Sequence, residues 1–540
     1  MNELKGLVNE PIKSYEIGSE ERSSLQKKYD ELSSNEIEIP IIINGEKILT
    51  DDTGECVMPH DHQHTLAKYH KANKDLALQA IESSLEAWTK WSKTDLDYRI
   101  DIFRKAATLL AGKWRDTINA ATMLNQSKNA FQAEIDAACE LIDFFNFNTL
   151  YAKNIHNKQE LISPAGMKNS LEYRPLEGFI FAITPFNFTS IAGNLPTAPA
   201  IMGNVSIWKP ASSAVYACYF LMELLKEAGL PDGVINFLPG TGANVGDPIL
   251  NHSSLAGVHF TGSTNTFNHI WKTIGSNIGQ YKTYPRIVGE TGGKDYCLAH
   301  ESCDIDVLVT AMVRGAFEYQ GQKCSAMSRA YIPKSLWPEV KEKFISEVKT
   351  IKVGSPKDFS NFMNSVIDKS AFDSISDYIQ YAKNHDDAEI VTGGNCDDSV
   401  GYFIHPTAIL TTDPQFKTMK EEIFGPVLTI YLYDIDKWDE TVDLVDSTSE
   451  YGLTGCIIAS NEEIIKQTTK KLTHSAGNFY INDKPTGAVV GQQPFGGSRA
   501  SGTNDKAGSE LNLLRWVSVR TIKENFEPPK NYRYPFLEKE

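Results

Sequence analysis

Strands and helices alternate between Gly178 and Ser263, and no other feature of the sequence limits the fold so strongly. Apolar strands are expected in "GFIFAITPFNF", "GNVSIWKPA", "VINFLPG" and "GVHFTGS". Helices are expected between them, in "YACYFLMELLKEAGLPDG" and "VGDPILNHSSL". Strands joined by helices in this way form a parallel sheet with helices on its faces. Such a sheet binds ligands at the carboxyl ends of its strands.

The rest of the chain is long enough for further domains. A chain of 540 residues exceeds one ordinary core, so two or three domains are expected. In "DLALQAIESSLEAWTKW" and "YRIDIFRKAATLLAGKW", apolar residues recur at helical spacing, which predicts amphipathic packing helices. Strands and helices alternate again from about Thr291 to Gly477 and predict a second α/β domain. The polar residues 1–38 predict a surface arm or helix.

Charge and composition exclude several classes of function. The net charge of −16 disfavours nucleic acid, whose phosphates would be repelled. No apolar run reaches membrane-spanning length, and the N-terminus has the character of neither a secretion signal nor a transit peptide. We therefore expect a cytoplasmic protein, or one of the mitochondrial matrix if a presequence has been removed. The 8 cysteines form no CxxC and no zinc spacing, so reduced thiols and no metal site are expected.

The stretch "FEYQGQKCSAMSR" places Cys324 among small and polar residues. A structural cysteine more often lies among Val, Leu and Ile, yet a free cysteine is usually a small buried hydrophobe. The stretch alone therefore leaves two alternatives open for Cys324, a nucleophile and a packing residue. Lys323 either helps to hold a thiolate or points elsewhere as a solvated neighbour.

Two motifs at strand ends are candidates for ligand binding and acid–base chemistry. In "HFTGSTNTF", Gly262 and Ser263 stand where a helix should begin, and the free N–H groups there suit a phosphate, unless Ser263 is an ordinary N-cap. Lys209 ends a neighbouring strand and adds a group for ribose hydroxyls. In "VGETGGKD", Glu290 is either a general base or a salt-bridge partner. The run "PGTGANVG" has the wrong spacing for a dinucleotide fingerprint and is interpreted as a strand-to-helix turn.

The order of these motifs resembles the aldehyde dehydrogenase superfamily. "ITPFNF", "FTGS", "GETGGK", "GQKCSA", "EEIFGPVL" and "PFGGSRASG" follow one another, and the resemblance extends from about residue 40 to residue 525. It implies an α/β fold with a Rossmann-like NAD-binding domain, an α/β catalytic domain and a small β oligomerisation arm. The implied bounds are 1–38 for an N-terminal arm, 39–154 and 173–291 (with a return segment near 478–504) for the NAD-binding domain, 292–477 for the catalytic domain, and 155–172 and 505–540 for the oligomerisation arm.

A narrower resemblance rests on "EYRPLEGF", "FEYQGQKCSA", "GNFYINDK", "VVGQQPFGGSRASGTNDKAG" and "LLRW". These segments look like the Δ1-pyrroline-5-carboxylate dehydrogenases in their stand-alone form. The resemblance implies NAD-dependent oxidation of L-glutamate γ-semialdehyde to L-glutamate, the second step of proline degradation, by a homodimer or higher homo-oligomer. The alternatives are a dehydrogenase of another small aldehyde and a non-catalytic relative. Intact Cys324, Glu290 and Asn187 disfavour the non-catalytic relative.

The resemblance also assigns the catalytic roles. Cys324 is implied as the nucleophile, because hydride leaves more readily from a tetrahedral thiohemiacetal than from a flat carbonyl, and a thioester then remains to be hydrolysed. The Asn187 amide and the Cys324 backbone N–H would stabilise the oxyanion. Glu290 would activate the water that cleaves the thioester, with deprotonation of the thiol as a second role.

The family pattern further implies contacts to cofactor and substrate. Those implied for NAD are Thr184, Lys209, Gly262, Ser263, Thr264, Asn265, Thr266, Glu422 and Phe424. Some members of the superfamily carry a glutamate that excludes a 2′-phosphate where this chain has Ser212, so NAD is expected but exclusion of NADP should be incomplete. Those implied for the substrate are Ser325, the backbone N–H groups of Gly487 and Ala488 for its α-carboxylate, and the rings of Phe188 and Phe495. Some relatives have serine in place of Ala488.

Overall fold

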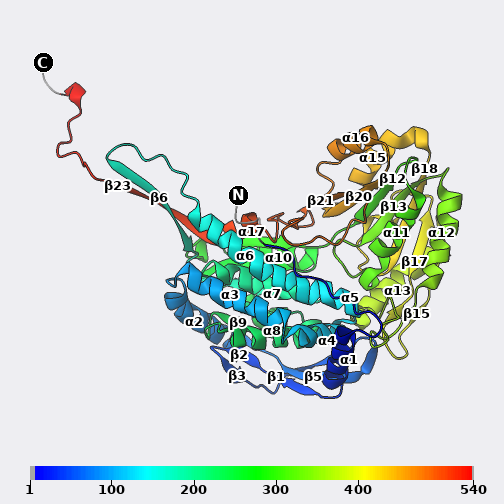
Figure 1. Ribbon diagram of the computed structural model, residues 1–540, viewed down its shortest axis with the longest axis horizontal. Helices are drawn as coiled ribbons and strands as arrows, with labels where there is room; N and C mark the ends of the chain where they lie inside the picture. Colours follow the sequence, from blue (N-terminus) through cyan, green and yellow to red (C-terminus); the bar gives the residue numbers. More distant parts are fainter. Residues whose placement is uncertain (1–6, 538–540) are drawn as a thin grey trace.

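The computed structural model describes residues 7–537, which form two α/β lobes and a projecting β-ribbon (Figure 1). Each lobe is built on a seven-stranded sheet with helices on its faces. The α/β class and the presence of two such units are therefore confirmed. In the described part of the chain, no helix combines the length and the apolar character needed to cross a bilayer.

The first sheet has the strand order β11-β10-β7-β8-β9-β2-β3. Its strands are β2 Ile41–Ile43, β3 Glu46–Ile48, β7 Phe179–Ile183, β8 Val205–Lys209, β9 Ile235–Phe237, β10 Leu255–Thr261 and β11 Arg286–Glu290. The five strands from β7 to β11 run parallel, and β2 is antiparallel to both of its neighbours. The parallel strands end on one edge, so Lys209 and Glu290 lie on the same edge of this sheet, as ligand sites of such sheets require.

The helices of the first lobe follow the predicted alternation with one difference. They are α1 Glu20–Ser33, α2 Lys74–Trp91, α3 Leu96–Ala111, α4 Arg115–Gln126, α5 Ala130–Ala133, α6 Glu140–Asn157, α7 Thr189–Ile201, α8 Val215–Ala228, α9 Asp247–Leu250 and α10 Thr264–Ser276. The segment predicted as a helix from residue 245 forms only the four residues of α9, preceded by a π-helical turn over Gly242–Gly246. Asn251 ends α9, and the chain enters β10 a few residues later.

The second sheet has the order β14-β17-β18-β13-β12-β20-β21. Its strands are β12 Asp295–Ala299, β13 Met327–Pro333, β14 Ala388–Thr392, β17 Thr407–Thr411, β18 Val427–Tyr433, β20 Thr454–Ile458 and β21 Asn478–Ile481, and its larger helices are α11 Ile305–Phe317, α12 Trp337–Thr350, α13 Lys369–Lys383, α15 Trp438–Ser447 and α16 Glu462–Lys471. Only the edge strand β14 is antiparallel. The central strands β12 and β20 are buried along their whole length, because helices cover both faces of the sheet.

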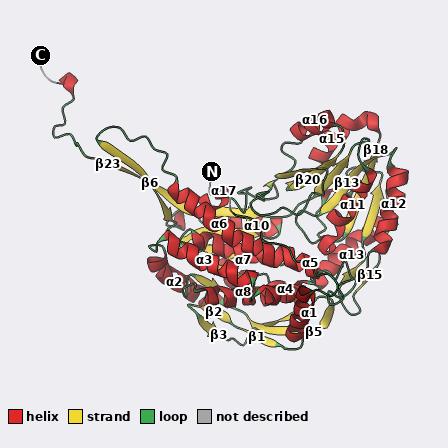
Figure 2. Ribbon diagram, in the orientation of Figure 1, coloured by secondary structure: helices red, strands yellow, loops and turns green. Residues whose placement is uncertain are grey.

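Smaller β elements complete the molecule (Figure 2). A sheet of β1 Ile37–Ile39, β4 Thr53–Met58 and β5 Asp61–His70 lies beside the first lobe and was not predicted from the sequence. The short pairs are β15 Cys396–Asp397 with β16 Phe403–Ile404, and β19 Tyr451–Gly452 with β22 Ser498–Arg499. The long β6 Met167–Pro175 and β23 Val517–Asn525 form the projecting ribbon, which follows the short helix α17 Glu510–Leu514.

Candidate active site

Cys324 lies in a cavity of about 370 Å³ to which both lobes contribute. The chain reaches it from α11 through a turn in which Tyr319, Gln320 and Gly321 have φ angles of 51°, 55° and 65°. This left-handed backbone is held by the Gln320 amide, which donates to the carbonyl oxygens of Ser127 (3.0 Å) and Ser365 (2.8 Å). Ser127 belongs to the first lobe and Ser365 to the second. We call residues 319–324 the nucleophile loop, after the role predicted for Cys324. The position of this loop therefore depends on contacts with both lobes.

The surroundings of Cys324 favour the protonated thiol. Burial raises the pKa of Cys324 well above its usual value, and the carboxylates of Asp295, Glu290 and Glu422 raise it further. Lys323, which the sequence left as a candidate partner of a thiolate, forms an ion pair with Glu318 at 3.4 Å. Its charge is thus neutralised by a neighbour, and the thiol needs a base to remove its proton.

Glu290 ends β11 and lines the same cavity as Cys324. It accepts a hydrogen bond from the Gly497 N–H at 3.3 Å and has no ion-pair partner among residues 7–537. Burial raises the pKa of Glu290 well above its usual value, and the hydrogen bond from Gly497 and the positive charge of Lys506 oppose this rise. Of the two alternatives left open by the sequence, this environment fits a general base better than a salt-bridge partner.

Donors for an oxyanion lie next to the thiol. The Asn187 Nδ2 group donates to the Gln322 carbonyl oxygen at 3.0 Å, which uses one of its two hydrogens and holds the amide against the nucleophile loop. The Cys324 backbone N–H donates to no other residue in the part of the chain that the structure describes. The two groups are thus buried donors with free capacity.

The predicted substrate contacts lie together around this cavity. Ser325, Gly487, Ala488, Phe188 and Phe495 all line it. Gly487 and Ala488 belong to residues 484–493, an irregular segment that we call the anchor loop. Their backbone N–H groups donate to no other group within residues 7–537. Unpaired N–H groups beside a cavity are suited to bind a carboxylate.

The predicted dinucleotide contacts lie at the carboxyl edge of the first sheet. Ser263 is the N-cap of α10 and accepts from the Thr266 N–H at 3.3 Å, while the N–H groups of Thr264 and Asn265 lack partners within the helix. At Gly262, a Cβ would lie 2.8 Å from the Phe260 ring, so any larger residue would force that ring to move. The free donors and the helix dipole fit a pyrophosphate.

Lys209 also fits this dinucleotide site. Burial lowers the pKa of Lys209, and its ammonium has no carboxylate partner among the described residues. Thr184 follows β7, and its hydroxyl accepts from the Trp208 indole at 2.9 Å. The Thr184 hydroxyl is therefore held in place at the edge where the cofactor is expected.

Glu422 connects this site with Cys324. Its carboxylate accepts from the Gly293 N–H at 2.9 Å, and burial raises the pKa of Glu422 to about 7. Gly293 packs against the nucleophile loop so closely that a Cβ there would lie 2.2 Å from the Cys324 carbonyl oxygen. Phe424 has a φ of 57° and contacts Phe186 edge to face. Glu422, the predicted ribose contact, and the backbone of Cys324 thus both lie against Gly293.

Two residues of the site, Thr486 and Lys506, were not predicted from the sequence. Thr486 hydrogen-bonds to the Ser325 hydroxyl at 2.7 Å, and only its place beside Gly487 could have indicated it. Lys506 donates to the carbonyl oxygens of Gly477 (2.8 Å) and Gly496 (3.0 Å) and faces Glu290 from a segment assigned to the oligomerisation arm. Both residues contact other segments of the chain, and no local sequence pattern predicts that these segments lie together.

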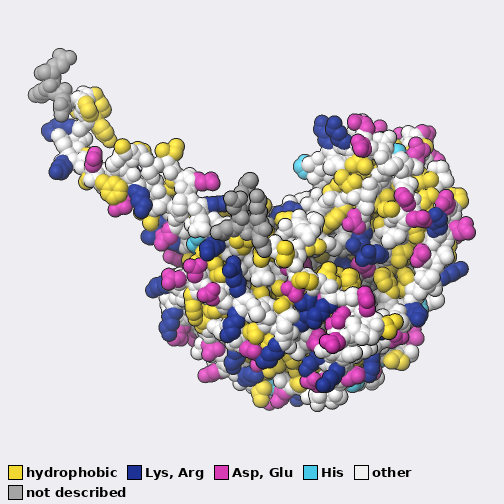
Figure 3. All heavy atoms as spheres, in the orientation of Figure 1, with side chains coloured by type: hydrophobic (Ala, Val, Ile, Leu, Met, Phe, Trp, Pro, Cys, Tyr) yellow, Lys and Arg dark blue, Asp and Glu magenta, His cyan; other side chains and the backbone are white. Residues whose placement is uncertain are grey.

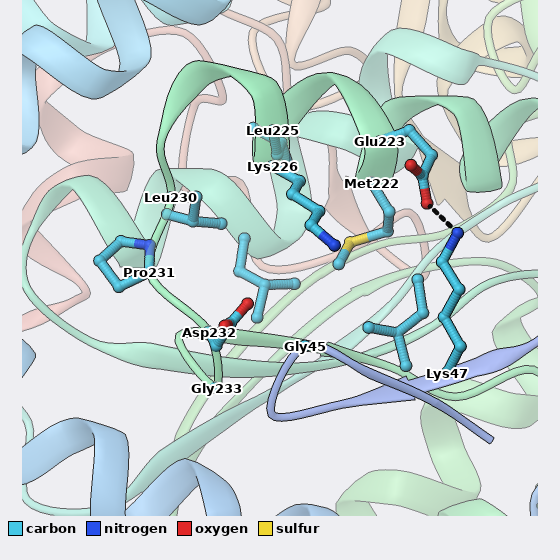
Figure 4. A pocket seen from close by; sticks show the side chains of 12 residues that line it. Gly45, Lys47, Met222, Glu223, Leu225, Lys226, Leu230, Pro231, Asp232 and Gly233 are labelled. Atoms are coloured by element: carbon cyan, nitrogen blue, oxygen red, sulfur yellow. Dashed lines mark ion pairs between the residues drawn. The ribbon is translucent and has the colours of Figure 1, made fainter.

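A second hollow lies far from this chemistry, between α8 and the β2–β3 turn (Figure 4). It contains the ion pair of Lys47 and Glu223 at 3.0 Å. No cysteine lines it. No group of three or more His, Cys, Asp or Glu side chains that could hold a metal occurs within residues 7–537. The cavity at Cys324 is therefore the candidate active site.

Comparison with known proteins gives consistent matches. The aldehyde dehydrogenase family model matches residues 49–522. The mitochondrial Δ1-pyrroline-5-carboxylate dehydrogenase of Dictyostelium discoideum is 53% identical over 532 residues, which cover 98% of this chain and 95% of that protein. The human mitochondrial protein of the same name is 47% identical over 533 residues, which cover 98% of this chain and 94% of that protein. A crystal structure of the Mycobacterium tuberculosis enzyme bound with NAD superposes with a TM-score of 0.95 at 48% identity, covering 99% of this chain and 98% of that one.

Proposed function

The chain belongs to the aldehyde dehydrogenase family. We propose which role each residue of the site has in the oxidation of L-glutamate γ-semialdehyde to L-glutamate. The enzyme is an NAD-dependent Δ1-pyrroline-5-carboxylate dehydrogenase, which acts in proline degradation on the semialdehyde formed when the pyrroline ring opens. One observation supports the substrate assignment within this chain. The cavity places the Cys324 thiol and the unpaired N–H groups of Gly487 and Ala488 around one space.

Cys324 carries the covalent chemistry in this proposal. Its sulfur forms a bond to the aldehyde carbon while the thiol proton leaves to a base, and the carbonyl oxygen becomes an oxyanion. The Cys324 N–H and the second hydrogen of the Asn187 amide donate to that oxyanion. Because Asn187 is already fixed by the Gln322 carbonyl, the donor is in position before the charge develops.

NAD, when bound, supplies the hydride acceptor for this reaction. We assign its pyrophosphate to the segment from Gly262 to Thr266 at the start of α10, where the N–H groups of Thr264 and Asn265 lack partners within the helix. We assign its ribose hydroxyls to Lys209 and Glu422. Thr184 and Phe424 complete these contacts. The Lys209 ammonium, which has no carboxylate partner within residues 7–537, and the free N–H groups at the N-terminus of α10 support the assignment.

Glu290 acts on the thioester that remains on Cys324. Its carboxylate takes a proton from water, the water oxygen bonds to the acyl carbon, and the carbon–sulfur bond breaks to release L-glutamate. The raised pKa of Glu290 makes it a stronger base than an exposed glutamate. Its lack of an ion-pair partner within residues 7–537 leaves the carboxylate free for this role.

The anchor loop selects the substrate. The N–H groups of Gly487 and Ala488 bind the α-carboxylate, Ser325 contributes its hydroxyl, and Phe188 and Phe495 enclose the aliphatic chain. The test is NADH formation with Δ1-pyrroline-5-carboxylate against a panel of plain aldehydes such as propanal. Equal kcat/KM values across the panel would contradict the substrate assignment.

We infer that the projecting ribbon of β6 and β23 pairs with a second copy of the chain. Figure 3 shows hydrophobic side chains on the surface of this projection. Val519 of β23 is 48% exposed, and Phe526, which follows β23, is 60% exposed. Apolar side chains on a projecting ribbon are typical of a subunit contact. A homodimer or higher homo-oligomer and the domain bounds given by the resemblance therefore stay our proposals.

The compartment is a further proposal. The sequence predicts a cytoplasmic protein, with the mitochondrial matrix as the alternative. The Dictyostelium and human relatives are named mitochondrial. Cell fractionation with an antibody against the chain separates the two compartments.

A further inference from the structure

Residues 9–15 form an extended segment, which we call the N-terminal strap, beside the substrate cavity. The strap has no helix or strand and leads to α1 (Figure 1). Asn9, Glu10 and Ile12 line the cavity that contains Cys324. The polar sequence of residues 1–38 predicted a surface arm or helix and gave no sign of a contact with the cavity. The structure makes it part of the active-site wall.

Buried carboxylates hold the strap in place. The Glu10 N–H donates to Asp143 on α6 at 2.8 Å. The Lys13 N–H and the Tyr15 hydroxyl donate to the two carboxylate oxygens of Glu134 at 2.9 and 2.7 Å. A buried carboxylate that loses its donors is destabilised, so these contacts favour one path for the strap.

Both the nitrogen and the oxygen of the Asn9 side-chain amide form hydrogen bonds, and these connect the strap to the anchor loop. Its Nδ2 group donates to Asp143 at 2.8 Å and to the Val490 carbonyl oxygen at 2.7 Å. Its Oδ1 atom accepts from the Gln492 side chain at 2.8 Å. A single side chain therefore connects α6, which is fixed in the first lobe, with a loop that has no strand partner.

The anchor loop is tied on both sides of the predicted carboxylate site. On one side, Thr486 hydrogen-bonds to Ser325 at 2.7 Å. On the other side, the contacts of Asn9 hold residues 490 and 492. Gly487 and Ala488 lie between these ties and donate to no group within residues 7–537. The direction of their N–H groups depends on both ties.

We propose that Asn9 is a positioning residue for substrate recognition, which holds the anchor loop so that the N–H groups of Gly487 and Ala488 face the α-carboxylate. The inference rests on the proposed function, because it assumes that this carboxylate is bound there. Asn9 acts through the loop and touches no reacting atom. Its loss should therefore weaken binding of aldehydes that carry the carboxylate and leave the chemistry at Cys324 unchanged.

The test is Asn9→Ala in the full chain, assayed with L-glutamate γ-semialdehyde and with propanal. We expect KM for the semialdehyde to rise about tenfold, the effect of one weakened hydrogen bond to a charged group, with kcat unchanged within about twofold. KM for propanal should stay at the wild-type value. Gln492→Ala removes only one of the three contacts of Asn9, so its effect should have the same selectivity and a smaller size.

Two further variants control the test. Asn35→Ala removes a surface amide that donates to the Glu31 carbonyl oxygen at 2.7 Å in the region of α1, and it should match the wild type with both aldehydes. Asn9→Asp keeps the size and the acceptor but places a second carboxylate against Asp143, so it should be impaired at least as much as Asn9→Ala. Thermal melting of each variant reports its stability.

The outcomes separate this inference from the function on which it rests. A wild-type enzyme with no preference for the semialdehyde over propanal overturns both. A wild-type preference combined with equal KM changes for the two aldehydes in Asn9→Ala and Gln492→Ala, or with no change in either, overturns the role of Asn9 alone. If Asn9→Ala fails to fold, Gln492→Ala decides, because it removes one of the two contacts of Asn9 with the loop and leaves the strap attached to α6.

Discussion

At the scale of single residues, the site contains a thiol that its surroundings keep protonated. Burial and three carboxylates raise the pKa of Cys324, and the adjacent Lys323 is already paired with Glu318. A thiol of this kind is unreactive until a base acts on it and a charge-stabilising environment is complete. Selective reactivity toward the bound substrate follows from this arrangement.

Cys324→Ala should abolish aldehyde oxidation and leave NAD binding near the wild-type value. The side chain lies outside the predicted dinucleotide contacts, and without the sulfur no thiohemiacetal forms. The measurement is steady-state turnover together with NAD titration by fluorescence. Turnover above about a hundredth of the wild-type value would contradict covalent catalysis by this residue.

Glu290→Gln should slow thioester hydrolysis more than hydride transfer. The expected trace is a rapid burst of NADH followed by slow turnover, because the amide cannot take a proton from water. A slowed burst without accumulated acyl-enzyme would instead indicate a role in thiol activation only. Stopped-flow absorbance with acid quenching distinguishes the two results.

The pH dependence of hydrolysis follows from the same residue. Only the ionised carboxylate of Glu290 is a base, and its pKa is raised well above the usual value. Ionisation, and with it the hydrolysis rate, should therefore increase as the pH rises through that raised pKa. In Glu290→Gln this rise should disappear, which single-turnover hydrolysis at a series of pH values checks. An unchanged pH profile in the variant would assign the titration to another group.

The sequence indicated the reactive residues of the site better than the residues that hold them in position. Cys324 and Glu290 stand in motifs whose order was informative, and both line one cavity in the structure. Asn9 could not be predicted, because its partners Val490 and Gln492 lie more than four hundred residues away and no local pattern relates them. Lys506 was missed because no local pattern relates it to Glu290, whose carboxylate it faces from a distant part of the sequence.

At the scale of elements, the helices and the parallel strands were predictable and the irregular segments were not. Periodicity gave α2 and α3 almost to their ends, since one face of each packs on the first lobe. The three-stranded sheet of β1, β4 and β5 was missed because its residues 53–70 mix polar and apolar side chains without clear alternation. The anchor loop has no regular pattern, so only the resemblance indicated its role.

Ala488→Pro should impair the anchor loop as an element. Proline removes one N–H donor and fixes φ, so kcat/KM for L-glutamate γ-semialdehyde should fall about ten- to a hundredfold, while propanal, which has no carboxylate, should be hardly affected. Ala488→Ser keeps the donor and should be nearly silent or mildly helpful. Both variants are assayed with both aldehydes and checked by thermal melting. Equal losses for the two aldehydes would show that the loop only supports the active site.

At the scale of the whole molecule, the projecting ribbon connects this chain to a second copy in our proposal. Val519→Asp should lower the oligomeric state, because it replaces an exposed apolar side chain of β23 by a charge. Ser518→Asp is the matched control, since the neighbouring residue points to the other face of the ribbon and lies near Arg174. Size-exclusion chromatography with light scattering measures the mass. A wild-type mass equal to one chain, or equal masses for both variants and the wild type, would contradict a subunit contact at this ribbon.

The left-handed turn before Cys324 has a consequence for how the enzyme becomes active. A left-handed backbone costs roughly 1–2 kcal/mol for each residue with a side chain, and here it is maintained by Gln320, which bridges Ser127 and Ser365. Neither lobe can supply both partners by itself. During refolding, helical content should thus recover before enzymatic activity does, and catalytic competence reports the docking of the two lobes as the last event of assembly.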